Sequence, residues 1–349
     1  MEKRIVILGF ESSCDETAVS LVVDGRKVLS DVVASQIDQH RRYGGVVPEL
    51  ASRAHVEAVN TVLADALAQS GIKRDEISAV AVTHQPGLIG SLLVGLMAAK
   101  TTAWLLGVPL IGVNHVCAHA YAAALDDEPI NYPAVALVCS GGHTSLYHLQ
   151  SPTKMELLGS TIDDAAGEAY DKVASILHLG FPGGPVIDRA ARRGNGHAVD
   201  FPRTLLKGQS LDFSFSGIKT AVLYHVNGVP NAKTDNGHAK GIENFSSQEV
   251  DDIAASFQDA VTDILTIKMR RAAKITGART LILGGGVAAN SGLREKAQKV
   301  ADKIGCTLRR PPMKYCTDNA AMIAGLGYHL LLAGQIADLR LSATPTVRI

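Results

Sequence analysis

Two histidines four residues apart are the first candidates for chemistry in this sequence. His115 and His119 are separated by Val-Cys-Ala, and on a helix residues four apart lie on one face, one turn above the other. Two imidazoles in that arrangement can bind one divalent metal ion, but paired histidines also occur on ordinary surface helices. A metal site would need a third ligand from elsewhere in the chain. No glutamate follows His115, so the H-E-x-x-H helix of zinc proteases is absent.

The elements around the two histidines are a strand and the helix that it leads into. Residues 108–113 form a short apolar run that predicts a buried strand, and residues 114–125 predict a helix with Asn114 as its N-cap. The histidines would therefore lie at the carboxyl end of a strand. That is where α/β folds usually bind their ligands.

Composition describes an ordinary globular protein of two domains. The chain has 349 residues, with 46% hydrophobic and 19% charged residues, enough for two sizeable cores. Lysine plus arginine equals aspartate plus glutamate at 34 each. Contact with nucleic acid would therefore need a local basic patch or a partner protein.

Cysteine usage and apolar runs predict a cytoplasmic protein. The five cysteines are odd in number and form no CxxC pair, which favours reduced thiols over a disulfide framework. Residues 1–4 lead directly into a strand without the apolar core of a signal peptide. No apolar run is expected to span a membrane.

A pattern of three strands followed by a helix occurs twice. The predicted strands of the first half are 5–10, 17–23 and 28–34, and those of the second half are 134–139, 144–149 and 155–162. Asp24-Gly25 predicts a two-residue hairpin turn in the first half, whereas 182–185 predicts a rigid loop before a helix from residue 186. The remaining predicted elements are helices 47–69, 88–106, 169–177, 247–276 and 319–333, strands 77–83, 280–283 and 306–309, and loops 207–212 and 225–244.

Two related α/β halves with polar turns toward a shared cleft indicate a nucleotide clamp. Ser140-Gly141-Gly142-His143 joins two strands of the second half, and Gly284-Gly285-Gly286 precedes a helix. Glycine-rich turns can hold phosphate because their backbone N–H groups are accessible and no Cβ blocks approach. The alternative is that these are hairpin turns without a ligand, as Asp24-Gly25 is.

Several motifs, in their number and order, resemble one family over nearly the whole chain. The residues that carry the likeness are Glu11-Ser-Ser-Cys-Asp-Glu-Thr17, Gly45-Val-Val-Pro-Glu-Leu-Ala-Ser-Arg53, Asn114 to His119, Ser140 to Thr144, Gly167-Glu-Ala-Tyr-Asp-Lys172, Phe181 to Pro185, Phe213 to Gly217, Gly284 to Asn290 and Cys316-Thr-Asp-Asn319. The chain resembles the TsaD family, formerly labelled Gcp or O-sialoglycoprotein endopeptidase.

The resemblance implies a fold and an activity. The fold is the two-lobed duplicated actin-like (ASKHA, ribonuclease H-like) α/β fold with a central cleft. Its first lobe would be 1–130 plus 310–349, and 131–309 would form the second lobe with most of the nucleotide site. The implied enzyme transfers the threonylcarbamoyl group from threonylcarbamoyl-AMP to N6 of adenosine 37 in tRNAs that read ANN codons. The implied partners are a TsaB-like paralogue and a TsaE-like ATPase.

The resemblance also implies a metal site and a base. His115, His119 and Asp318 would bind one divalent metal, with Fe(2+) favoured and Zn(2+) possible, because two histidines and a carboxylate suit both. Asp318 could instead be a helix N-cap. Asp15 and Glu16 are the catalytic candidates for taking a proton from the adenine amine, or they are plain turn residues.

The implied substrate site lies in the second half. The turn Cys139, Ser140, Gly141, Gly142 and His143 would bind the phosphate and acyl part of the adenylate. Asp171 and Asp188 would accept the ribose hydroxyls, Gly184 would let the chain approach the sugar, and Asn290 would reach the nucleoside. Asp171 and Asp188 could instead be solvated helix carboxylates.

Two departures and three rival functions stay open. His84-Gln85-Pro86-Gly87 stands where many relatives have glycine before the proline, and the loop 225–244 is irregular and is assigned no role. The stretch His40-Arg41-Arg42-Tyr43 with Arg53, and the pair Arg192-Arg193, are either tRNA contacts or solvated faces. The rivals are a small-molecule kinase, which gives no reason for the metal ligands to converge, a metalloprotease, which lacks its glutamate, and a nucleotide-binding scaffold.

On the first-lobe helix, the apolar residues Val56, Val59, Leu63 and Leu67 are either a docking surface or core.

Overall fold

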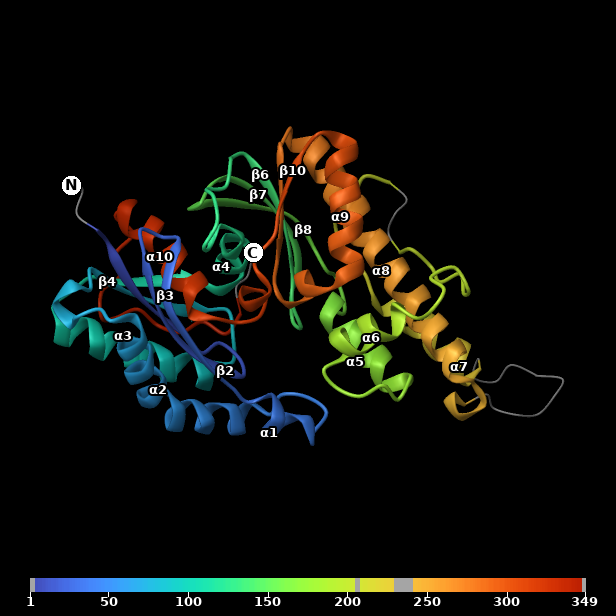
Figure 1. Ribbon diagram of the computed structural model, residues 1–349, viewed down its shortest axis with the longest axis horizontal. Helices are drawn as coiled ribbons and strands as arrows, with labels where there is room; N and C mark the ends of the chain where they lie inside the picture. The colour runs from blue at the N-terminus through green and yellow to red at the C-terminus, as the bar shows by residue number, and fades with distance from the viewer. Residues whose placement is uncertain (1–3, 205–207, 229–240, 347–349) are drawn as a thin grey trace. The chain divides into compact units, whose positions relative to one another are not determined.

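The computed structural model describes residues 4–204, 208–228 and 241–346 and divides into two compact units (Figure 1). Unit 1 comprises Met1–Ile130, Gln150–Met155 and Arg309–Ile349, and unit 2 comprises Asn131–Leu149 and Glu156–Leu308. Parts of the two predicted loops, residue 207 and residues 229–240, lie outside the described residues.

The sheet of unit 1 has five strands in the order β3-β2-β1-β4-β5. Strand β1 pairs antiparallel with β2, β2 pairs antiparallel with β3, and the pairs β1–β4 and β4–β5 are parallel. The bounds are β1 Val6–Glu11, β2 Glu16–Val23, β3 Lys27–Ser35, β4 Ala79–Gln85 and β5 Leu110–Asn114. Each strand lies within two or three residues of its predicted position.

Helices cover both faces of this sheet. On one face, α2 (Pro48–Ser70) and α3 (Ile89–Leu106) pack over the side chains of Leu8, Phe10 and Leu21. On the other, α10 (Ala320–Leu332) packs against β1, β2 and β4. The short helices of unit 1 are α1 Ile37–Arg41, α4 His115–Tyr121, and the 3-10 turns Arg74–Glu76, Ala122–Ala124 and Met313–Tyr315.

A glycine in β1 allows α10 to approach the sheet closely. A Cβ on Gly9 would lie 2.5 Å from the Ala320 carbonyl oxygen and 2.9 Å from the Ala324 Cβ. Because alternate residues of a strand face opposite sides, Gly9 faces α10 while its neighbours Leu8 and Phe10 face α2 and α3. This contact holds the start of α10, and the residues just before it, against the end of β1.

Unit 2 repeats the strand order of unit 1. Its sheet runs β8-β7-β6-β9-β10, with β6–β7 antiparallel and β6–β9 parallel, as β1–β2 and β1–β4 are in unit 1. The strands are β6 Ala134–Cys139, β7 Thr144–Ser151, β8 Lys154–Ser160, β9 Thr280–Gly284 and β10 Thr307–Arg309. The predicted duplication is therefore confirmed strand by strand.

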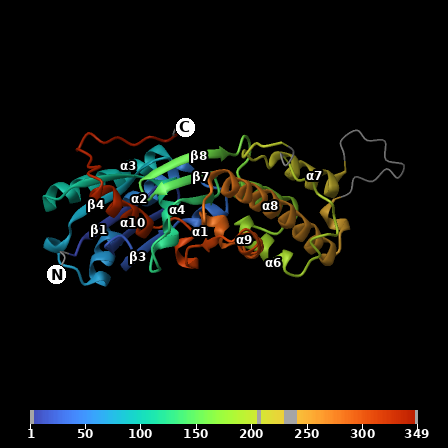
Figure 2. The same cartoon turned by 90° about the horizontal axis from the view of Figure 1, so that it is seen from above.

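The helices of unit 2 are organised by one long helix, α8 (Ser247–Thr276), which begins and ends where the sequence predicts. It packs against β6, α6 and α9 (Figure 2). The others are α5 Ala166–Ile176, α6 Gly183–Ala191, α7 Ser216–Asn227, α9 Ser291–Ile304, and the 3-10 turns η3 Ile242–Asn244 and η4 Gly286–Ala289.

Three local predictions are wrong. Residues 183–185 form the first turn of α6 rather than a rigid loop, because Asp171 Oδ1 accepts the Gly183 amide there and proline is tolerated in a first turn. Residues 225–227 end α7 rather than beginning a loop. The hairpin loop has three residues, since Val23 pairs with Lys27, and both Asp24 and Gly25 have positive φ.

The expectation that no apolar run reaches membrane-spanning length is also corrected. Helix α3 passes that test by length and composition, with 18 residues, a mean hydropathy of 1.5 and 33% of its residues buried. A core helix passes the same test, and Leu92, Leu96 and Ala99 of α3 are buried. The apolarity of α3 is therefore weak evidence for a membrane span.

Candidate functional site

The predicted metal-binding helix exists and carries both histidines. The Asn114 side chain caps α4 by accepting the amides of Val116 at 2.9 Å and Cys117 at 3.1 Å. His115 and His119 then lie one turn apart with ring centroids separated by 4.6 Å, and both are buried. The face predicted from their spacing is confirmed.

Asp318 joins the two histidines. One ligand atom from each of the three residues lies within 4.8 Å of the others. Asp318 Oδ1 is 3.0 Å from His119 Nε2 and 3.5 Å from His115 Nε2. The N-cap of α10 is the next residue, Asn319, whose Oδ1 accepts the Met322 amide at 2.9 Å. The alternative reading of Asp318 as a helix cap is therefore wrong.

A buried glutamate behind His115 is the residue that sequence reasoning missed. Glu11 Oε2 lies 2.9 Å from His115 Nδ1 and accepts the Thr83 hydroxyl at 2.6 Å. Glu11 Oε1 accepts the Ser13 amide at 2.5 Å, and the Glu11 side chain has no exposed surface. A carboxylate on Nδ1 holds the proton there and leaves Nε2 to face Asp318, the usual support of a metal-binding histidine. Glu11 lies 104 residues from His115, so no local signal could have linked them.

Charges in this cluster shift the pKa values of both histidines. Burial would lower the pKa of His115, but the charges of Glu11 and Asp318 and the hydrogen bond to Glu11 outweigh it and raise the pKa to about 9. Burial and the nearby charge of His115 hold the pKa of His119 below its usual value. The same contacts with His115 keep the pKa of Glu11 low in spite of burial.

The predicted catalytic pair lies beside the cluster. Burial, followed by the charges of Asp318 and Asp15 and a hydrogen bond to Asp15, raises the pKa of Glu16 to about 10, while the Ser35 hydroxyl opposes the shift. Glu16 therefore holds a proton at neutral pH when no cation is bound. Behind these residues, His55 Nε2 donates to the Cys14 carbonyl at 3.0 Å and fixes the turn.

The residues present fit a divalent metal ion. Two imidazoles and one carboxylate form a mixed nitrogen and oxygen donor set that suits Fe(2+) or Zn(2+). Burial and then the charge of Asp318 raise the pKa of the neighbouring Glu16. A cation would offset the negative charge of Asp318. Among the described residues, the buried His119 Nδ1 has no hydrogen-bond partner.

In unit 2, the glycine turn after β6 leaves its backbone accessible. The Ser140 hydroxyl accepts the His143 amide at 3.1 Å, and the Ser140 amide donates to the His143 carbonyl at 2.8 Å. Gly141 and Gly142 are exposed, and a Cβ on either would meet nothing within 4 Å. Gly285, at φ +82°, lies so close to the Cys139 carbonyl that no side chain fits between them. The turn is therefore fixed by its own hydrogen bonds and by Gly285, while the backbone of Gly141 and Gly142 stays exposed.

The two predicted ribose aspartates have different surroundings. Asp171 is half-buried, and its Oδ1 accepts the Gly183 amide at 2.7 Å at the start of α6, next to Gly184. Burial raises the pKa of Asp171, although the Gly183 amide opposes it. Asp188 is 7% exposed, so its reading as a solvated carboxylate is wrong.

A hydrogen-bonded network surrounds Asp188 and reaches Asn290. Asp188 Oδ1 accepts the Ser291 amide at 3.2 Å, the Ser291 hydroxyl at 2.7 Å and Gln258 Nε2 at 3.1 Å. Asn290 Nδ2 donates to Gln258 Oε1 at 2.6 Å, and its Oδ1 caps α9 through the Leu293 amide. Gln258, which was not predicted, therefore links Asp188 and Asn290, two predicted site residues that are distant in sequence.

Three of the five arginines considered as tRNA contacts have acidic partners within the chain, and His40, considered with them, is buried. Arg192 pairs with Asp188 Oδ2 at 2.9 Å, and Arg193 pairs with both oxygens of Asp251 at 2.6 and 2.7 Å. Arg41 pairs with Asp38 at 3.0 Å. These pairs are exposed on the arginine side and are weak by themselves, so they neither require nor exclude RNA contact.

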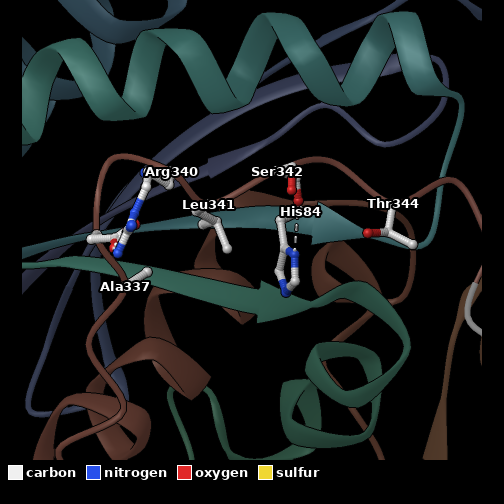
Figure 3. Close-up of a pocket in the computed structure, with 7 residues that line it drawn as sticks. His84, Ala337, Arg340, Leu341, Ser342 and Thr344 are labelled. Carbon is white, nitrogen blue, oxygen red and sulfur yellow. Dashed lines mark hydrogen bonds and ion pairs between the residues drawn. The ribbon is translucent and has the colours of Figure 1, made fainter.

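A separate hollow in unit 1 contains none of the predicted site residues. It has a volume of about 480 Å³ and is lined by His84 and the C-terminal segment (Figure 3). The His84 ring faces the Ser342 carbonyl, and Arg340 pairs with Asp338. His84 therefore packs against the C-terminal segment, and the Thr344 amide also donates a hydrogen bond to the His84 carbonyl.

The chain is similar to known proteins over almost its whole length. The family model described as TsaD, tRNA N6-adenosine threonylcarbamoyltransferase, matches residues 27–325. The chain is 51% identical to the enzyme of that name from Symbiobacterium thermophilum, over 97% of this chain and 96% of the relative. It is 49% identical to the Bacillus cereus enzyme of the same name, over 100% and 98%.

Among solved structures, full-length HypF in its phosphate- and nucleotide-bound form aligns with a TM-score of 0.60 at 12% identity, covering 97% of this chain and 48% of HypF. At that identity the likeness shows the fold alone, and it agrees with the predicted duplicated actin-like fold. The family match and the full-length relatives show that the chain belongs to the TsaD family of tRNA N6-adenosine threonylcarbamoyltransferases.

Proposed function

We propose that this transferase moves the threonylcarbamoyl group from threonylcarbamoyl-AMP to N6 of adenosine 37 in tRNAs that read ANN codons. The observation that carries the proposal is the convergence of His115, His119 and Asp318, supported by Glu11, in a member of this family. N6 of the adenine attacks the carbamoyl carbonyl carbon, a C–N bond forms, and the bond from that carbon to the phosphate oxygen breaks. AMP leaves with the electron pair, and the amine loses one proton.

The metal held by His115, His119 and Asp318 is Fe(2+) in this proposal, with Zn(2+) as the alternative. When bound, a divalent cation supplies positive charge that stabilises negative charge as it develops on oxygen. Glu11 keeps the Nε2 atom of His115 available by holding the proton of Nδ1. No serine nucleophile is needed, because the carbonyl is already activated by its link to phosphate.

The nucleotide binds in unit 2 in this proposal. The exposed backbone of Gly141 and Gly142 in the Ser140–His143 turn suits the phosphate and acyl part, with the buried Cys139 next to this turn. Asp171 keeps its Oδ2 for a ribose hydroxyl, since Oδ1 is committed to Gly183. Asp188 Oδ2 would accept the other hydroxyl by exchanging the exposed Arg192 for it, next to Asn290.

Asp15 and Glu16 are the proposed proton acceptors. Glu16 cannot accept a proton while its pKa stays near 10. A cation held by His115, His119 and Asp318 would lower that value, because it would oppose the charge of Asp318 that helps to raise it. Proton removal by Glu16 would therefore depend on a filled metal site.

Partners and compartment also remain proposals. We infer that tRNA, a TsaB-like paralogue and a TsaE-like ATPase meet the enzyme in the cytoplasm, and that the two compact units correspond to its two lobes. Of the four apolar residues considered for docking, Val59 is buried, Leu63 and Leu67 pack partly against the core, and Val56 is 61% exposed. Val56 and the exposed α3 residues Leu93 and Met97 are the proposed docking surface.

The test is direct synthesis of the modified nucleoside. Metal-loaded protein would be incubated with threonylcarbamoyl-AMP and unmodified tRNA, with and without a TsaB-like partner, and digested tRNA analysed by mass spectrometry. We expect product with wild-type protein and with the control His197→Ala, whose side chain is exposed. We expect none with His115→Ala or Asp318→Asn. Tight nucleotide binding without product under any condition would support the scaffold or kinase alternatives instead.

A further inference from the structure

A buried glutamine outside the predicted site connects two of its members. Gln258 lies on α8, whereas Asp188 lies on α6 and Asn290 begins α9, and all three are between 7% and 8% exposed. We propose that Gln258 is a positioning residue of the nucleotide site, which fixes how Asp188 and Asn290 are presented to the AMP portion of the donor. This inference rests on the proposed nucleotide site in unit 2.

The direction of every hydrogen bond in this network is fixed by chemistry. An ionised carboxylate only accepts, so Gln258 must turn its NH2 group toward Asp188. Its oxygen then faces Asn290 and accepts from Nδ2. The oxygen of Asn290 is left to accept the Leu293 amide at the start of α9. One glutamine amide thus determines which face each neighbour presents.

Close packing leaves Gln258 little freedom to adopt another orientation. A Cβ on Gly292 would lie 3.0 Å from Gln258 Nε2, so the backbone of α9 lies directly against the amide. Buried polar groups that lose their partners are costly, and a network of this kind is stable only when each member is satisfied. Removing the Gln258 side-chain amide should leave Asn290 Nδ2 without its acceptor and remove one of the hydrogen bonds that Asp188 accepts.

The test variant is Gln258→Met, which preserves length and burial and removes both hydrogen bonds. We expect AMP affinity, measured by calorimetry, to fall about tenfold or more, equivalent to about 1.4 kcal/mol. The KM for threonylcarbamoyl-AMP should rise while kcat at saturating donor stays near the wild-type value. Metal affinity should not change. Gln258→Asn, which is too short to span both partners, should behave in the same way if the methionine variant folds poorly.

The matched control is Thr266→Val, a buried polar substitution on the same helix. Thr266 donates only to carbonyls of its own helix, so its loss tests general damage to α8. A double-mutant cycle with Asn290→Ala adds a readout that a structural role would not move. Because Gln258 would act partly through Asn290, the loss of AMP affinity in the double variant should be smaller than the sum of the two single losses.

The outcomes separate this inference from the proposed function. If Asp171→Ala, Asp188→Ala and Asn290→Ala all leave AMP binding intact, the proposed nucleotide site itself is wrong. If those variants weaken AMP binding but Gln258→Met behaves like Thr266→Val, the site is right and the role of Gln258 is wrong. Additive effects in the cycle would also overturn it.

Discussion

At the scale of single residues, the metal site could be predicted only in part. The spacing of His115 and His119 predicted a shared helical face, because helical periodicity is a local property. Asp318 lies 199 residues from His119, and only resemblance to a family pointed to it. Glu11 belongs to a motif that carried the resemblance, but nothing in the sequence linked it to His115, since its role depends on which side chain the fold places against its carboxylate.

Glu11 supplies the first prediction. Glu11→Ala should weaken binding of Fe(2+) or Zn(2+) by about 10- to 100-fold, because the His115 ring loses the acceptor that fixes its tautomer. Competition with a chromophoric chelator measures this affinity without relying on activity. Glu57→Ala on exposed α2 surface is the control. Equal affinities for the two variants would show that Glu11 does not support the site.

Asp31 supplies a prediction about pH. Burial raises its pKa to about 6, although the backbone amides of Ala320 and Ala321 oppose the shift, and among the described residues its Oδ1 has no hydrogen-bond partner. Because the folded pKa lies above the ordinary value of 3.8, the folded state binds more protons between these values. The free energy of unfolding must then fall as pH rises through that window.

The variant Asp31→Asn cannot titrate and should lose this pH dependence. Between pH 4 and pH 6 its stability relative to wild type should rise by about 2 kcal/mol, because the folded pKa of about 6 lies above the ordinary value of 3.8. Urea unfolding across that range, with chelator present, measures the difference. A constant gap between the two proteins would mean that Asp31 titrates normally.

At the scale of elements, strands and long helices followed from the sequence, and helix starts were less predictable. The predicted first residue of α8 is confirmed, and in the structure Ser246 and Glu249 form a capping box there. The start of α6 was missed because a run of proline and glycine usually indicates a loop, whereas here a distant carboxylate, Asp171, caps the first turn. Tertiary contacts of this kind have no signature in the local sequence.

The contact between β1 and α10 gives a prediction at this scale. Gly9→Ala should lower the free energy of unfolding by about 1 to 3 kcal/mol, because its Cβ would overlap the Ala320 carbonyl and force the helix outward. Chemical denaturation provides the measurement. Gly45→Ala, with nothing within 4 Å of its Cβ, should change stability little, and similar losses for both variants would contradict the packing argument.

At the scale of the whole molecule, the duplication was the most predictable feature. Two three-strand patterns followed by helices in sequence became two five-stranded sheets with the same order. Family membership then assigned chemistry that neither pattern nor composition could provide. The neutral net charge gave no indication of an RNA substrate, since the substrate depends on particular sites rather than on overall charge.

The proposed docking surface belongs to this scale. Met97→Asp should abolish binding of a TsaB-like paralogue in size-exclusion or calorimetric experiments, because it places a charge among the exposed apolar residues of α3. Metal affinity and folding should stay at wild-type levels, since Met97 is 56% exposed. Unchanged partner binding would place the interface elsewhere.

The most direct measurement of the central claim compares metal-free protein before and after Fe(2+) is restored. With threonylcarbamoyl-AMP, tRNA and any required partner present, wild-type protein should regain formation of the modified nucleoside. Asp318→Asn should stay inactive while still binding AMP, because the nucleotide residues lie in the other unit. Modified nucleoside from Asp318→Asn at the wild-type rate would contradict the assignment of the metal site.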